Sequence, residues 1–172
     1  VPLTKIQESL GVKANEEFWS SYEKRVEEFK AFDPELVIIF RGNHMDGIHL
    51  KLMPQFVVIH AAEALDDCGG WPGPLDVPMD VATALTEHLN EREFDITTSY
   101  AMEVDHGFSN PLRYFMGELN ARPVLPININ TIADPRPTLR RCRLLGEEIG
   151  RFAKTLNKRI AFLGTGGLSH QT

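Results

Sequence analysis

Three of the six histidines in this 172-residue chain share one setting, directly after a segment with the pattern of a β-strand: His44 after Leu36–Phe40, His106 after Asp95–Ala101 and His170 after Arg159–Leu163. Open α/β sheets place their binding and catalytic residues at the carboxyl ends of strands. Imidazole binds transition metals and exchanges protons near neutral pH. The spacing therefore predicts a histidine site at one edge of a sheet. The alternative is that three loop histidines follow strands by coincidence.

The stretch 103–112 around His106 carries the strongest local signal. Gly107 follows the histidine directly and can adopt positive φ without strain, which favours a tight turn at this point. A short apolar helix is expected at 112–116, after the turn. His106 is therefore predicted to lie on a turn between a strand and a helix.

The remaining histidines, the glycine-rich turn and the serines give weaker signals for a site. His49, His60 and His88 lie inside segments with regular patterns, where a structural role is the simpler interpretation. The glycine-rich turn 164–167 lacks the lysine of a P-loop and the spacing of a dinucleotide site. Ser109 and Ser169 lack the context of a nucleophile elbow. The residues thus indicate a histidine-rich site without fixing its chemistry.

The elements that must position these histidines alternate between strand and helix patterns. Helices are expected from the N-cap candidate Asn15 to Asp33, around Val81–Leu89 and along Leu139–Leu156, where apolar residues recur at helical spacing. Phe56–His60 and Pro123–Ile129 are expected as further strands, the second at an edge or a bulge because of Pro126. The stretch 66–78 has the prolines and glycines of a surface loop. This order predicts a single α/β domain with a mixed or largely parallel sheet flanked by helices.

Composition limits the classes of partner. A formal net charge of -6 and a pI near 5.5 argue against binding to nucleic acid or to an anionic membrane. No apolar run approaches the length of a membrane span. Cys68 and Cys142 have no metal-binding or redox spacing, so both are expected to stay reduced. We expect a cytoplasmic protein.

Several motifs resemble those of one enzyme family: Val104–Leu112, Thr155–Arg159, Phe162–Gln171, Asp33–Val37 and Leu145–Phe152. These segments are similar to the class III extradiol ring-cleavage dioxygenases, and most of all to the branch that cleaves 2,3-dihydroxyphenylpropionate. The similarity runs over nearly the whole chain. It implies cleavage of a catechol by dioxygen at a non-haem Fe(II) held by two histidines and one carboxylate. It also implies a homo-oligomer.

The resemblance assigns a role to each of the three histidines. His44 matches a family iron ligand, whereas His106 and His170 match two acid–base groups, one that deprotonates the catechol and one that later donates a proton. The other two iron ligands of the family fall outside 1–172, so the chain is expected to be a catalytic domain incomplete at both ends. Asp46, Glu103 and Asp105 could replace a carboxylate ligand, although exposed loop acids are the simpler reading. A non-enzymatic binding protein of this fold and a zinc-dependent hydrolase remain as alternatives.

Overall fold

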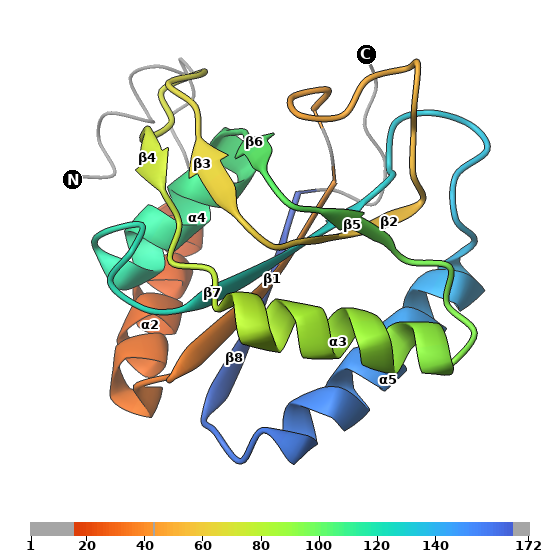
Figure 1. Cartoon of the computed structure of the whole chain (residues 1–172). Helices are drawn as coiled ribbons and strands as arrows, with labels where there is room; N and C mark the ends of the chain where they lie inside the picture. Colours follow the sequence, from red (N-terminus) through yellow and green to blue (C-terminus); the bar gives the residue numbers. More distant parts are fainter. Residues whose placement is uncertain (1–15, 43, 167–172) are drawn as a thin grey trace.

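A five-stranded sheet forms the centre of the molecule, as a computed structural model that describes residues 16–42 and 44–166 shows (Figure 1). The strand order is β5-β2-β7-β1-β8. The strands are β1 (Leu36–Gly42), β2 (Phe56–Ile59), β5 (Thr97–Ser99), β7 (Val124–Ile129) and β8 (Ile160–Thr165). Neighbouring strands are parallel except for β2 and β7, which are antiparallel. The prediction of a mixed, largely parallel α/β sheet is therefore confirmed.

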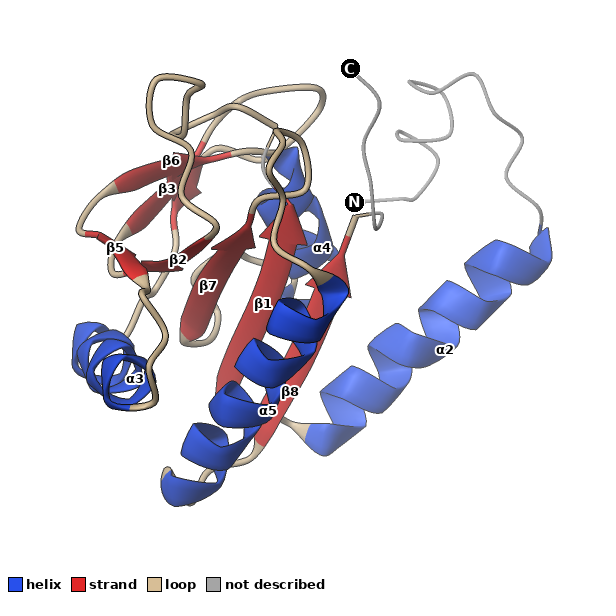
Figure 2. Cartoon of the chain, turned by 90° about the vertical axis from the view of Figure 1, so that its right-hand side faces the viewer, coloured by secondary structure: helices blue, strands red, loops and turns tan. Residues whose placement is uncertain are grey.

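Helices cover both faces of this sheet (Figure 2). The described helices are α2 (Glu16–Phe32), α3 (Met79–Glu91), α4 (His106–Met116) and α5 (Leu139–Thr155). Residues of α3 and α5 pack in one apolar cluster, and residues of α2 and α4 pack in a second cluster on the opposite face. The helices expected from 15, 81 and 139 onward are confirmed, although the proposed cap Asn15 lies outside the described residues. None of the described helices combines the length and apolar character needed to cross a membrane.

The side chains of β1 point alternately to the two faces of the sheet, so helices must pack on both faces to bury them. Leu36 and Ile38 point into the α3–α5 cluster, whereas Val37 and Ile39 point into the α2–α4 cluster. All four side chains are at most 1% exposed. Since each fully buried side chain of this kind contributes about 1.5–3 kcal/mol, β1 is a main source of stability on both faces. The uniformly apolar sequence of this strand follows from its central position.

β7 corrects the expectation that Pro126 places its strand at an edge. The strand lies between β1 and β2, so it is internal. The pairing with β2 runs only from Ile127 to Ile129, and Pro126 lies just beyond it. A residue without a backbone N–H is tolerated there because that ladder has already ended.

A second, three-stranded sheet has no counterpart among the sequence predictions. It consists of β4 (Gly73–Pro74), β3 (Ala62–Ala64) and β6 (Met102–Val104), in the order β4-β3-β6. The expected surface loop 66–78 thus contributes β4. The run expected as one strand from Asp95 to Ala101 is shorter, since only Thr97–Ser99 pairs in the large sheet. The chain then enters the small sheet and turns directly into α4.

Candidate active site

Asp105 begins α4 and thereby fixes His106. The Asp105 carboxylate accepts a hydrogen bond from the backbone N–H of Gly107 at 2.6 Å, as an N-cap does. His106 is consequently the first residue of the helix, whereas the sequence predicted a turn with the helix starting at Leu112. Gly107 does not have the positive φ that was expected. The start of a helix, rather than a loop, therefore holds His106.

Arg41 and Asp105 form a buried ion pair beneath this helix end. The Arg41 Nε lies 3.6 Å from Oδ1 of Asp105, and the two side chains are 6% and 3% exposed. Burial lowers the pKa of the Arg41 guanidinium from its ordinary value, and the nearby Asp105 carboxylate partly offsets this effect. Asp105 is therefore not the exposed loop acid that its sequence context suggested.

Glycines make room for the buried guanidinium. A Cβ at Gly107 or at Gly166 would overlap the side chain of Arg41. Gly166 has a φ of +84°, a conformation that residues with a Cβ rarely adopt. These two positions therefore require glycine because Arg41 lies against the backbone there.

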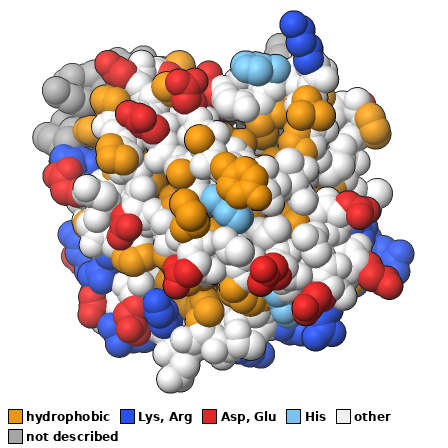
Figure 3. Space-filling view, in the orientation of Figure 1, with side chains coloured by type: hydrophobic (Ala, Val, Ile, Leu, Met, Phe, Trp, Pro, Cys, Tyr) orange, Lys and Arg blue, Asp and Glu red, His pale blue; other side chains and the backbone are white. Residues whose placement is uncertain are grey.

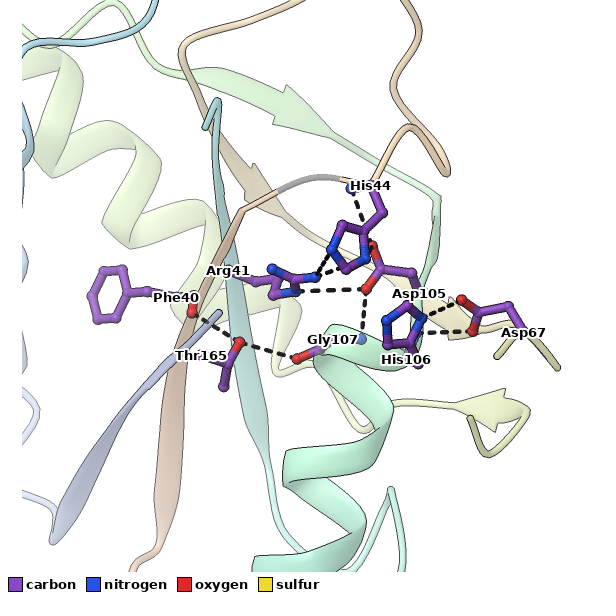
Figure 4. A network of polar contacts seen from close by, with 8 residues as sticks. All are labelled: Phe40, Arg41, His44, Asp67, Asp105, His106, Gly107 and Thr165. Carbon is purple, nitrogen blue, oxygen red and sulfur yellow. Dashed lines mark hydrogen bonds and ion pairs between the residues drawn. The ribbon is translucent and has the colours of Figure 1, made fainter. Parts of the chain in front are cut away.

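His44, which follows the end of β1, contacts the carboxylate of Asp105 as well. Its backbone N–H donates to Oδ2 of Asp105 at 3.3 Å, and its ring Nδ1 lies 3.4 Å from the same oxygen. Nη2 of Arg41 lies 2.7 Å from Nδ1 of His44. The imidazole is thus held between a guanidinium and a carboxylate (Figure 4).

His106 stacks on His44 and is held by Asp67. The centroids of the two imidazole rings are 4.8 Å apart, with an angle of 25° between the ring planes. Nδ1 of His106 lies 2.5 Å from Oδ2 of Asp67. Two of the three predicted histidines therefore meet at one edge, whereas His170 lies outside the described residues.

The end of β8 joins this edge as well. The Thr165 hydroxyl lies within hydrogen-bonding distance of two carbonyl oxygens, that of Gly107 at 3.0 Å and that of Phe40 at 3.3 Å. β1, α4 and β8 thus meet around Arg41. His170 follows the end of β8 by five positions in the sequence, outside the described residues.

The other histidines lie outside this cluster. His60 is buried after β2, where its Nε2 lies 3.1 Å from the Thr86 hydroxyl, and burial lowers its pKa. His88 lies on α3 and faces Glu148 at 3.5 Å. His49 is exposed in the loop after β1, in an isolated bridge with Leu52 rather than in a regular segment. Structural roles for His60 and His88 agree with their positions.

The donor atoms of the cluster suit a metal ion. Ligand atoms of His44, Asp105 and His106 lie within 4.8 Å of one another. Two imidazoles and a carboxylate are the ligand types of non-haem iron sites. Burial and the carboxylates of Asp105 and Asp67 raise the pKa of Asp46, and Nη2 of Arg41 contacts both ring nitrogens of His44. The Asp105 carboxylate is already engaged by Arg41 and by the start of α4, and Nδ1 of His106 by Asp67, so an ion at His44 needs further ligands.

An apolar pocket of about 760 Å³ opens beside the loop that carries His44. Its walls include Met45, Ile48, Val57 and Met102, with Lys51 among the few polar lining residues. Figure 3 shows the hydrophobic side chains gathered on this face of the molecule. Pockets of roughly 300–1,000 Å³ with mostly apolar walls are typical of small-molecule sites.

Comparison with known proteins identifies the family. The model of the catalytic LigB subunit of aromatic ring-opening dioxygenases matches residues 1–172. A 2,3-dihydroxyphenylpropionate/2,3-dihydroxicinnamic acid 1,2-dioxygenase of Pseudomonas putida is 49% identical over 142 residues, which cover 83% of this chain and 45% of the relative. Enzymes of the same description from Azotobacter vinelandii and Escherichia coli are 48% and 47% identical, over 84% of this chain and 46% of each relative. The chain thus spans about half the length of these relatives, and it belongs to the LigB family of aromatic ring-opening dioxygenases.

Proposed function

We propose that this chain supplies part of the active site of an Fe(II)-dependent enzyme that opens a catechol ring with dioxygen, next to the two hydroxylated carbons. The observation that supports this most directly is the stacked pair of His44 and His106, each beside its own carboxylate. The pair lies at the carboxyl edge of the sheet in a member of the LigB family. Metal binding and proton transfer are the two functions that such a pair combines.

His44 would hold the iron, together with ligands from outside the described residues. Bound Fe(II) would supply adjacent coordination positions for the two catechol oxygens and for dioxygen. Asp105 orients His44 through its contacts with the backbone N–H and with Nδ1. Carboxylates that orient a ligating histidine typically change metal affinity or activity by about 10–100-fold.

His106 would move a proton to or from an oxygen atom of the substrate. Its Nδ1 faces the carboxylate of Asp67, so Nε2 is the ring nitrogen that remains for proton exchange. His170 would be the second acid–base group, as the family resemblance implies. Its sequence position, just after β8, is consistent with this role, since β8 ends at the same edge.

The substrate would be a catechol with an apolar side chain, such as 2,3-dihydroxyphenylpropionate, which is named for the relatives. The pocket beside His44 supports this proposal, because its walls are mainly apolar. Lys51 provides a positive charge among the lining residues, and a propionate group carries a negative one.

The test measures iron content and oxygen uptake with 2,3-dihydroxyphenylpropionate for three variants of the full-length protein. H44A should lose iron and activity together. H106A and H170A should keep their iron and lose about 10²–10⁴-fold in turnover, the usual contribution of a general acid or base. If H106A lost its iron as H44A does, His106 would be a ligand and the assignment would be wrong. Zinc in place of iron, without oxygen uptake, would support the hydrolase alternative.

A further inference from the structure

Asp67 contacts His106 twice, from a loop that no sequence pattern connected with the site. Its Oδ1 accepts a hydrogen bond from the backbone N–H of His106 at 2.9 Å. Its Oδ2 lies 2.5 Å from Nδ1 of the same residue. The two side chains are 23% and 28% exposed, so they stand at the rim of the protein interior.

The loop that carries Asp67 is fixed by hydrogen bonds of the residues that follow Asp67. The backbone N–H of Gly70 donates to the carbonyl oxygen of Asp67 at 2.5 Å, which closes a tight turn. The next residue, Trp71, donates its backbone N–H to the hydroxyl of Ser109 at 3.3 Å. Ser109 is fully buried on α4, the same helix that begins with His106. The loop is therefore attached to α4 independently of the Asp67 side chain.

We infer that Asp67 is a positioning residue for His106, an inference that rests on the acid–base role proposed above. A carboxylate at Nδ1 accepts a hydrogen bond from the N–H of that nitrogen, which selects the tautomer with an unprotonated Nε2. Because Oδ1 of Asp67 is held by the backbone N–H of His106, Oδ2 is fixed beside the ring, and the imidazole cannot rotate about its side-chain bonds without losing its contact with Oδ2. Asp67 thus fixes which ring nitrogen exchanges protons and where it lies.

The role differs from that of Asp105. Asp105 caps α4 through the N–H of Gly107 and pairs with Arg41, so it acts on the fold as well as on His44. Among the residues that the structure describes, both hydrogen-bonding contacts of the Asp67 side chain are with His106, although its charge also acts on Arg41 and Asp46. Its removal should consequently affect proton transfer more than folding.

The experiment compares D67A, D67N, H106A and the double variant D67A/H106A in the full-length enzyme loaded with Fe(II), with oxygen uptake on 2,3-dihydroxyphenylpropionate as the assay. D66N, a change at the exposed neighbour, is the matched control. D67A should lower kcat at least 10-fold, by no more than H106A does, with iron content and KM close to those of the parent. D67N should fall between D67A and the parent, since an amide oxygen can still accept from Nδ1–H. The double variant should be no slower than H106A, because Asp67 acts through the imidazole.

Unchanged turnover in both D67A and D67N would overturn the inference. So would a double variant that is slower than H106A by the full factor of D67A, because the two residues would then act independently. If D67A did not fold, D67N and its KM and kcat would decide the question, since the side chains are similar in size. A parent enzyme without oxygen uptake on any catechol would instead overturn the proposed function.

Discussion

The buried pair of Arg41 and Asp105 gives the sharpest prediction for stability. D105A removes the N-cap of α4 and leaves the guanidinium of Arg41 without its carboxylate. Loss of a cap costs about 1 kcal/mol. Breaking a buried ion pair from one side costs about 3–5 kcal/mol, because the remaining charge stays buried. D105A should therefore lower the free energy of unfolding by roughly 4–6 kcal/mol, a large part of the roughly 5–15 kcal/mol typical of a domain.

Three further variants separate the cap from the charge. D105N keeps an acceptor for the N–H of Gly107 but loses the charge, so about 3–5 kcal/mol should be lost. T138A removes only a cap, because Thr138 caps α5 by accepting from the N–H of Arg141 at 3.2 Å. Its cost should be about 1 kcal/mol. R41M added to D105N should recover part of the loss, since the unpaired charge is then gone.

The assay is urea unfolding followed by circular dichroism, at one protein concentration for all variants. The distance of 3.6 Å identifies an ion contact rather than a hydrogen bond, so the predicted losses depend on burial of the charge. If D105A and T138A destabilised the protein equally, the guanidinium would have access to water when its partner is removed. The same conclusion would follow if R41M had no effect in the D105N background.

Two further predictions concern packing and ionisation. G107A should lower the free energy of unfolding by about 1–3 kcal/mol, because its Cβ would overlap Arg41. G146A on α5 should raise it by up to about 1 kcal/mol, since nothing lies within 4 Å of a Cβ there and alanine favours a helix over glycine. The urea midpoints of the two variants check both signs. Burial, with a smaller effect of Tyr114, raises the pKa of Tyr22 from 10.0 to about 12. The neutral phenol of Tyr22 is thus favoured in the folded state, so its contribution to stability is complete below pH 10 and should be lost between pH 10 and about 12. Titrating the absorbance of ionised tyrosine in the parent and in Y22F checks this, because only the parent should show the late ionisation of Tyr22.

Much of the fold follows from the periodicity of the sequence. The stripes of α3 and α5 and the apolar run of β1 have their expected positions, because each helix is buried along one face and β1 along both. Pro126 misled the prediction, since the consequence of a missing N–H depends on where the neighbouring strand ends. The small sheet could not be foreseen, because its strands have at most three residues each. Such short segments carry no detectable period.

Only part of the site could be predicted from the sequence, because its contacts join segments that are far apart in the chain. His44 and His106 do meet, but not as strand ends of one sheet: His106 follows β6 of the small sheet, and the packing of α4 brings it to the end of β1. Asp67 lies in a loop rich in glycine and proline, and its contact with His106 spans 39 positions in the sequence. The pair of Arg41 and Asp105 likewise joins two distant segments. Contacts between distant side chains are set by how the elements pack, and one sequence does not disclose this.

Arg41 accounts for two of the glycines near the site. In the glycine-rich turn after β8, the side chain that lies against Gly166 is that of Arg41. The glycine in Asp-His-Gly has the same cause, because Gly107 contacts Arg41 from the other side. One buried guanidinium therefore sets the separation of β1, α4 and β8, the three elements that lead to His44, His106 and His170. A change that preserves every histidine but enlarges either glycine should therefore disturb the site, although by less than the loss of the Asp105 carboxylate.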